Sequence, residues 1–256
     1  MGFLKVELVC LLVFVGFYLL GTLLVYFKVS QPARYAFDML PTPTMDVITK
    51  QEFKDYVNAI EMLGFDLVAN LYSENPATNT RHIISLLYNR SVGDQAIASE
   101  ISASNNGTAV KSTLYIEFVS EFTDGREICT NNSKTLGVFA PVPEKPIYQF
   151  PEIKNAASLY SIHSALARDL NAYKSPLPLE GNEVSTLVDG IERSLVRQTK
   201  TGYMYLDDSS QTYRPTLKGA AIMTFKSLWP ASTIRKHRAR SRSLNIRKKY
   251  QIAVTT

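Results

Sequence analysis

The sequence predicts an α+β protein: an N-terminal single transmembrane helix, one domain with an antiparallel β-meander packed on helices, and a basic C-terminal tail, helical or disordered. Three observations support this: an uncharged apolar run near the start, several short strand patterns joined by turns, and two amphipathic helical patterns after them. The expected parts are an anchor at 1–28, a stalk at 29–47, an α+β soluble domain at 48–214, and an apolar interfacial segment with a polybasic tail at 215–256.

The anchor is predicted from residues 8–27, which read LVCLLVFVGFYLLGTLLVYF, twenty positions without a charge. About 20 apolar residues in a helix cross the hydrocarbon core of a bilayer, and a helix satisfies its own backbone hydrogen bonds there. A cleaved signal peptide has a shorter apolar stretch and a small-x-small cleavage site, and neither pattern fits here. We therefore expect an uncleaved, single-pass signal-anchor in the lipid bilayer.

The orientation of the anchor follows from the charges beside it. Lys28 and Arg34 follow the apolar run and Lys5 precedes it, so the positive-inside bias slightly favours a cytoplasmic soluble domain. Cys10 lies inside the run and Cys129 outside it, so no internal disulfide is expected. This arrangement suits a reducing compartment.

Prolines in residues 29–47 predict an extended stalk. A helix is then expected, because Thr49 and Glu52 have the spacing of a capping box and apolar residues recur at helical intervals up to Leu63. Gly64 is expected to end it.

A run of strands follows this helix. Short apolar or alternating segments separated by Gly-Asp, Asn-Gly and Asp-Gly turns predict an antiparallel meander. The expected strands are 67–72, 82–88, 96–102, 113–122 and 127–131.

The longest strand has two different faces. Leu114, Ile116 and Phe118 share the apolar face, and successive side chains of a strand point to opposite sides. The other face is predicted to be mainly exposed to water and is the candidate interaction face for an unknown protein partner, through surface contact or β-augmentation. Its residues are Tyr115, Glu117, Val119 and Glu121.

Two helices are expected after a Pro-rich crossing segment, at about 152–173 and 183–199. Leucine, isoleucine and valine recur in both at helical spacing, and Asn182 precedes the second as an N-cap. We therefore expect these helices to cover one face of the sheet.

Catalytic motifs are largely absent, since the chain has no G-x-S-x-G, G-x-G-x-x-G, H-E-x-x-H or C-x-x-C sequence. His163 is the weak catalytic candidate, with Ser161, Ser164 and Asp169 near it on the same predicted helix. The alternative is a structural histidine at the edge of the core. No metal site and no cofactor are predicted. The absence of catalytic motifs favours a protein that is not an enzyme, and an enzyme that uses His163 stays as an alternative.

The segment 234–250 carries eight Lys or Arg residues and no acidic residue. The whole chain has a net charge of +5, so the positive excess belongs to this segment. Trp229 ends the apolar segment that precedes it and suits a membrane interface. The candidate membrane-surface residues are Trp229, Arg235, Lys236, Arg238, Arg240, Arg242, Arg247, Lys248 and Lys249.

Three interpretations of the basic segment remain open: a solvated disordered tail, contact with anionic lipid head groups, and nucleic-acid binding. Nucleic acid is disfavoured because no aromatic residues interleave with the cations.

The order from 183 to 229 is helix, strand, turn, strand, helix, with the spacing Tyr213-x-x-Thr216-x-x-Gly219 after the second strand. This stretch resembles the recognition helix, wing and following helix of winged-helix DNA-binding domains. The resemblance implies a DNA-contacting surface on 183–199 and the hairpin that follows. That helix carries Glu183, Asp189 and Glu192 beside its arginines, and the preceding helix–turn unit of the family is missing.

Together these patterns favour a non-catalytic interaction or scaffold module held at the membrane surface. The alternatives are a membrane-tethered enzyme that uses His163 with a carboxylate, and a membrane-tethered winged-helix-like regulator.

Overall fold

The computed structural model describes residues 2–75, 80–105, 108–170, 172–175 and 180–251. Within these ranges, the structure describes only the backbone of residues 2–5, 8, 10, 11, 46, 75, 104, 105 and 108–111. Backbone contacts divide the chain into two compact units. Unit 1 comprises Met1–Tyr35, Gly137–Ala140 and Gly190–His237, and unit 2 comprises Ala36–Leu136, Pro141–Asp189 and Arg238–Thr256.

These units do not follow the expected limits at residues 28, 47 and 214. Residues 29–47, expected to form a stalk, include strands β1 (Gln31–Pro32) and β2 (Asp38–Met39) and helix α2 (Thr42–Ile48). Strand β1 pairs with a strand of unit 1 and β2 with a strand of unit 2. Pro32 stands in β1, at the edge of its sheet, where a missing backbone donor is tolerated. Pro41 is the N-cap of α2 and Pro43 lies in its first turn, where the backbone donor has no partner within the helix.

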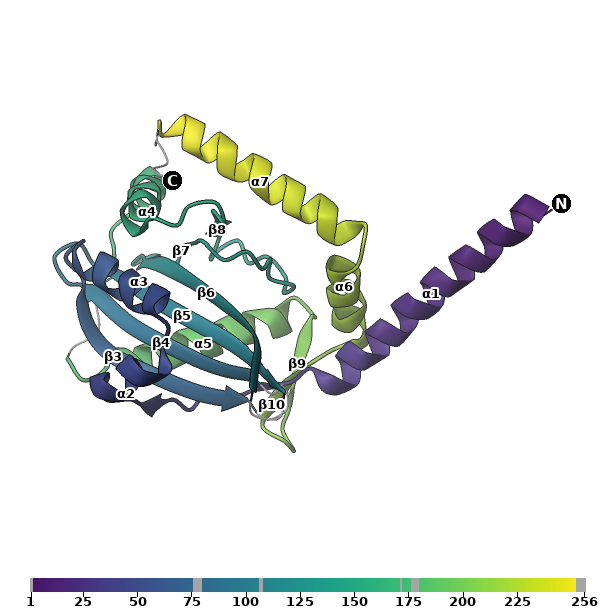
Figure 1. Ribbon diagram of the computed structural model, residues 1–256, viewed down its shortest axis with the longest axis horizontal. Helices are drawn as coiled ribbons and strands as arrows, with labels where there is room; N and C mark the ends of the chain where they lie inside the picture. Colours follow the sequence, from purple (N-terminus) through teal and green to yellow (C-terminus); the bar gives the residue numbers. More distant parts are fainter. Residues whose placement is uncertain (1, 76–79, 106–107, 171, 176–179, 252–256) are drawn as a thin grey trace. The chain divides into compact units, whose positions relative to one another are not determined.

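The sheet of unit 2 has seven strands in the order β2-β3-β4-β5-β6-β7-β8. All neighbouring pairs are antiparallel except β7 and β8, which are parallel. Figure 1 shows the long strands β3 to β6 side by side in one twisted layer. The antiparallel meander is thus confirmed. Its bounds beyond β2 are β3 Asp66–Asn75, β4 Thr80–Asn89, β5 Asp94–Asn105, β6 Thr108–Glu121, β7 Glu127–Asn131 and β8 Ile147–Gln149.

One face of this sheet packs on α3 (Gln51–Glu61) and α4 (Ala156–Asp169). Most of the side chains between them are apolar and buried, because alternate residues of each strand point to this face. The protein is therefore an α+β fold, with seven helices among the described residues. Large buried side chains of this core include Phe53, Ile60, Phe65, Leu87, Ile116, Phe118, Phe122, Ile128, Phe150, Ile153, Leu159 and Ile162.

The predicted capping box before α3 is wrong. Lys50 is the N-cap of α3 and makes no side-chain cap bond. The hydroxyl of Thr49 donates to the carbonyl of Met45 at 2.6 Å instead. Thr49 is engaged there because it follows α2 directly and satisfies one of that helix's last carbonyl groups.

Unit 1 contains α1 (Gly2–Lys28), the second half of α5 (Glu183–Lys200), β9 (Met204–Asp207), β10 (Thr212–Pro215) and α6 (Leu217–Ser227). Its sheet has the order β1-β10-β9, all antiparallel. The predicted helix, hairpin, helix order is therefore present. Leu195, Met204, Tyr213 and Met223 form its small core.

Helix α1 has few polar side chains, and its C-terminal part packs on α6. The Tyr18 hydroxyl donates to the Ala221 carbonyl at 2.9 Å. In the part of the chain that is described, no helix is long and apolar enough to cross a membrane. The transmembrane helix expected at 8–27 therefore lacks support from the structure and stays a prediction.

The basic segment is helical, as α7 (Ala231–Lys249), so its disordered alternative is wrong. Repulsion between cations one turn apart opposes this helix. Arg247, Lys248 and Lys249 lie in its last turn, where positive charge favours the helix dipole.

Gly219 sits where two segments of unit 1 approach very closely. A Cβ atom placed on it would lie 1.9 Å from the carbonyl oxygen of Tyr203. Thr216 causes this approach, because its hydroxyl donates to the Gly202 carbonyl at 2.7 Å and accepts from the Gly219 amide at 2.9 Å. The N-terminus of α6 is thereby held against the start of the β9–β10 hairpin.

We predict that Gly219→Ala destabilises unit 1 by about 1–3 kcal/mol or more, since backbone must shift to admit the methyl group. Thermal unfolding and hydrogen exchange of β9, β10 and α6 would measure this. The matched control is Gly137→Ala, in the same unit, where no atom lies within 4 Å of the new carbon. Equal exchange rates for the two variants would contradict the close approach.

Candidate functional site

His163 lies at the centre of a buried polar network in unit 2. Its ring is completely buried between α4 and the sheet. Nε2 lies 2.9 Å from the Ser120 hydroxyl of β6, and Nδ1 lies 3.1 Å from the Thr130 hydroxyl of β7. The Ser120 hydroxyl donates in turn to Asp94 at the start of β5. Three strands and one helix thus contribute to a single hydrogen-bonded chain.

Asp94 is the charged end of this chain and is 1% exposed. Besides Ser120, it accepts from the Tyr160 hydroxyl at 2.8 Å and from the Lys174 ammonium. Lys174 also donates to the Val92 carbonyl at 3.0 Å. Each carboxylate oxygen therefore has at least one donor, which is what a buried carboxylate requires.

The direction of these bonds defines the state of the histidine. Because Ser120 gives its proton to Asp94, its oxygen accepts from His163 Nε2–H. Nδ1 is then unprotonated and accepts from the Thr130 hydroxyl. His163 is neutral in this arrangement, and burial lowers its pKa to about 4, with the Asp94 charge opposing that shift and Lys174 adding to it.

This arrangement does not serve nucleophilic catalysis. A catalytic serine gives its proton to histidine, and the carboxylate orients the other ring nitrogen. Here the serine proton goes to the carboxylate, and Ser120, Thr130 and His163 are all fully buried. The network fits a structural role, with the histidine deeper in the core than expected.

Ser161 and Asp169, expected near His163, lie on the same helix α4 but do not hydrogen-bond to its ring. The Ser161 hydroxyl donates to the Ala157 carbonyl of its own helix at 2.9 Å, and Asp169 pairs with Lys249. The ring's hydrogen-bond partners, Ser120 and Thr130, come from strands β6 and β7. No spacing in the sequence indicates these contacts. The sequence pattern around Asp94 indicates only a turn.

The candidate interaction face is less open than predicted. Val119 is buried, while Tyr115, Glu117 and Glu121 are partly exposed. Glu117 accepts from the Asn131 side chain at 2.9 Å, and burial raises the pKa of Tyr115. These side chains are therefore partly engaged with neighbouring strands, and their role in binding a partner stays a prediction.

Four of the eight cations of the basic segment have partners. Arg235 donates to the Lys226 carbonyl at 3.1 Å and to the Gly137 carbonyl, within unit 1. Within unit 2, Arg242 stacks on the Tyr148 ring, Arg247 lies 3.7 Å from Glu152, and Lys249 pairs with Asp169. These contacts place one side of α7 on unit 2, where Ser243 and Ile246 also pack.

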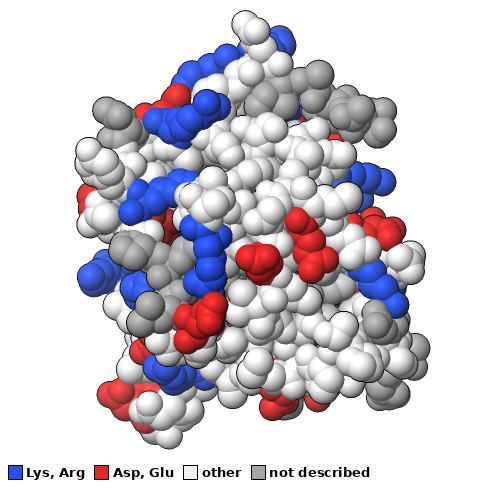
Figure 2. Space-filling view, turned by 90° about the vertical axis from the view of Figure 1, so that its left-hand side faces the viewer, with Lys and Arg blue, Asp and Glu red and all other residues white. Residues whose placement is uncertain are grey.

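The other four cations are Lys236, Arg238, Arg240 and Lys248. All four are exposed, and none makes an ion pair with another described residue. Figure 2 shows one side of the molecule, on which basic and acidic side chains are scattered among uncharged ones, with acidic groups near the centre of the view. Trp229 is also exposed, just before α7.

Metal ligation has no geometric support among the described residues, where no group of three His, Cys, Asp or Glu side chains could hold an ion. Cys129 is buried, and burial raises its pKa well above the ordinary value. A thiol in that state is a poor nucleophile and a poor metal ligand.

We predict that acid destabilises unit 2 through His163. Its folded pKa, about 4, lies below its unfolded value near 6.5. The unfolded state thus binds more protons between these two pH values. The contribution of His163 to the free energy of unfolding is therefore fully present above about pH 6.5. It is lost as the pH drops towards 4, which lowers the free energy of unfolding by up to about 3 kcal/mol.

Chemical unfolding at several pH values would measure this slope, the change in the free energy of unfolding with pH. His163→Gln should flatten it, with a residual slope from His82, whose pKa burial also lowers to about 4. His237→Gln, at an exposed site on α7, is the matched control and should keep the full slope. An unchanged slope in His163→Gln would contradict the neutral, buried state of this ring.

Comparison with known proteins gives no relative from which a role could be transferred. The chain matches no family model, no curated protein and no solved structure. The interpretation of its sites therefore rests on their own geometry.

Proposed function

We propose that this chain is a non-catalytic interaction module held at a membrane surface by α1. The observation that carries the proposal is the exposure of apolar side chains on every side of that helix. Leu12, Val13, Phe14 and Val15 are consecutive, so they point in four different directions, and each is 41% to 61% exposed. A helix of a soluble domain has a polar face, and this helix has none in that region.

Lipid is the environment that suits such a helix. Twelve large apolar side chains between Val6 and Phe27 are 41% to 68% exposed. Removing one such side chain from water contributes about 1.5–3 kcal/mol. The uncharged run 8–27 would extend roughly 30 Å as a helix, which matches the hydrocarbon thickness. A single-pass anchor at 8–27 is therefore part of the proposal.

The non-catalytic part of the proposal rests on the state of His163. Both ring nitrogens and the adjacent serine are occupied by internal hydrogen bonds. A general base needs a free nitrogen within reach of substrate. The alternative of an enzyme that uses His163 with a carboxylate therefore has no supporting observation.

The exposed cations of α7 support contact with the anionic lipid of the same membrane. Each cation near such a surface contributes up to about 1 kcal/mol. Anionic lipid is concentrated in the cytoplasmic leaflet, which fits the cytoplasmic orientation favoured by Lys28 and Arg34. An unknown protein partner would then meet the part of unit 2 that stays in water, with Tyr115, Glu117 and Glu121 as the candidate face.

A second candidate function is a membrane-tethered DNA-binding regulator. It is favoured by the β9–β10 hairpin of unit 1, which follows α5 and leads directly into α6. The turn of this hairpin carries Asp207 and Asp208, and Ser209 and Ser210 lower the Asp207 pKa to about 2. Asp207 ends β9 and lies 3.6 Å from Arg214, so this end of the hairpin has no excess positive charge, and Asp208 in the turn would repel phosphate. The first function is therefore preferred.

We predict that the full chain stays in the membrane pellet after alkaline carbonate extraction. The double variant Val13→Asp/Phe17→Asp should move to the supernatant, since a charge in the bilayer centre costs about 2.5–3.5 kcal/mol on the insertion scale. Both positions are exposed in unit 1, so the fold should tolerate them.

The matched control is Met62→Asp/Tyr173→Asp, which places the same charges at exposed apolar positions of unit 2. It should remain in the pellet. Extraction of the unaltered chain by carbonate, or equal extraction of the two double variants, would overturn the membrane anchor.

A further inference from the structure

We infer that a groove on α7 binds the phosphate monoester head group of an anionic lipid, with Arg238 and Arg242 as its clamp. This inference deepens the proposed function, because it rests on unit 2 lying at a membrane. It names one site and one ligand chemistry, whereas a diffuse basic surface would attract any anion.

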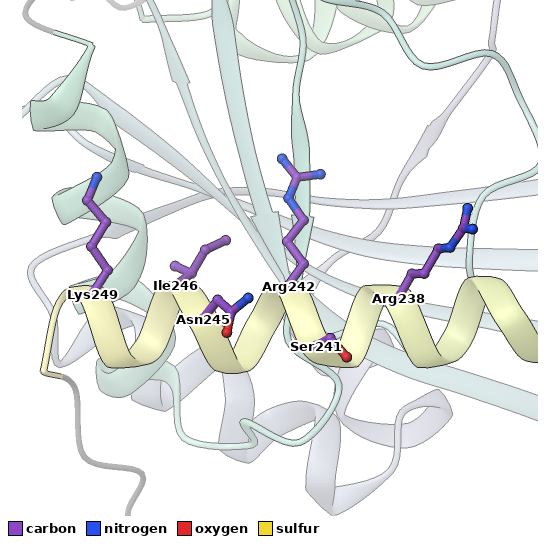
Figure 3. A pocket seen from close by; sticks show the side chains of 6 residues that line it. All are labelled: Arg238, Ser241, Arg242, Asn245, Ile246 and Lys249. Carbon is purple, nitrogen blue, oxygen red and sulfur yellow. The ribbon is translucent and has the colours of Figure 1, made fainter.

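The groove has a volume of about 470 Å³ and lies along one side of α7. It is lined by Arg238, Ser241, Arg242, Asn245, Ile246 and Lys249. Their spacing of three and four residues puts them on one face of the helix. Figure 3 shows Arg238, Arg242 and Lys249 projecting to the same side. None of the described residues that line the groove is acidic.

Arg242 is held in place by an aromatic ring. Its guanidinium carbon lies 4.6 Å from the centroid of the Tyr148 ring, in a cation–π contact. Such a contact uses the face of the guanidinium and leaves its N–H donors along the edge available. Within the described structure these donors have no hydrogen-bond acceptor. Stacking therefore reduces the entropy that this side chain loses when it binds an oxyanion.

Arg238 supplies the second half of the clamp. It lies one turn before Arg242, is exposed, and makes no hydrogen bond or ion pair to a described side chain. Arginine binds phosphate oxygens through two parallel N–H bonds. Two arginines four residues apart can thus contact different oxygens of one phosphate group.

The charge of the groove matches a phosphate monoester. Lys249 is already paired with Asp169, so two of the three cations of the groove are uncompensated. A phosphate monoester carries a charge of about −1.5 to −2 near pH 7, as phosphorylated side chains do. A phosphodiester carries a single charge and would leave one arginine unpaired.

The neutral lining residues fit the rest of a lipid head group. Ser241 and Asn245 offer hydroxyl and amide groups to ester and glycerol oxygens, and Ile246 offers an apolar surface between Arg242 and Lys249. A glycerolipid with a terminal phosphate combines these three chemistries. A free phosphate ion would use only the arginines.

Calorimetric titration of the full chain in a neutral detergent with dihexanoyl phosphatidic acid tests the site. This lipid is soluble, so it reaches the groove whether or not α1 crosses a bilayer. Saturable binding at a 1:1 ratio is expected, and Arg238→Gln or Arg242→Gln should weaken it at least tenfold. Arg240→Gln and Lys236→Gln remove the same charge outside the groove and should change the affinity less than about twofold.

Circular dichroism of Arg242→Gln would show whether loss of the Tyr148 contact unfolds α7. If it does, Arg238→Gln still tests the groove, because Arg238 does not make that contact. Two further titrations separate the sources of the anion. Dihexanoyl phosphatidylglycerol should bind at least tenfold more weakly, and inorganic phosphate should also bind more weakly than the lipid.

Absence of binding, or equal effects of groove and control variants, would overturn the inference. Equal affinity for phosphatidylglycerol would overturn the monoester preference, and equal affinity for inorganic phosphate would overturn the lipid ligand. Extraction by carbonate with intact phosphatidic acid binding would instead reject the anchor and keep the groove.

Discussion

The carboxylate of Asp94 is the constraint on which the core of unit 2 depends. It is buried at the start of β5 and bonded to Ser120 of β6, Tyr160 of α4 and Lys174. Removing a charge from water costs several kcal/mol unless its partners are in place. Sheet, helix and the segment 172–175 must therefore assemble together. His163 extends the network to Thr130 of β7, and its neutral state avoids a second buried charge.

Ion pairs with acidic residues also explain how the basic segment α7 can form a helix. Its cations repel one another along the helix, and acidic partners in unit 2 offset part of that repulsion. Glu152 forms an ion pair with Arg247 and accepts a hydrogen bond from Ser243. Asp169 forms an ion pair with Lys249 and accepts a hydrogen bond from the Tyr250 hydroxyl. Arg247 and Lys249 are thus neutralised, whereas Arg242, which also packs on unit 2, keeps its positive charge, as do the exposed cations of the helix. The positive charge that remains is therefore confined to defined positions of the helix.

The sequence predicts the meander well, because alternating polarity and Gly-containing turns are local signals. It also predicts α5, the β9–β10 hairpin and α6. It does not predict the parallel pairing of β7 with β8, since β8 spans only Ile147–Gln149 and depends on tertiary contact. The sequence of 29–47 indicates a stalk because its prolines favour extended backbone, whereas Pro32 lies in an edge strand and Pro41 and Pro43 begin helix α2. The partners of His163 and the Tyr148 contact of Arg242 join residues far apart in the chain, so no local pattern indicates them.

Spin labels on α1 would test the central claim, that this helix lies in lipid, most directly. Single cysteines at positions 13, 17 and 20, with Cys10 replaced by Ser and Cys129 by Ala, would be labelled in the full chain reconstituted into bilayers. We expect collisions with dissolved oxygen to be frequent and collisions with a polar nickel complex to be rare, with a gradient along the helix. Frequent collisions with the nickel complex at all three positions, as at an exposed position of unit 2 such as 62, would contradict the account.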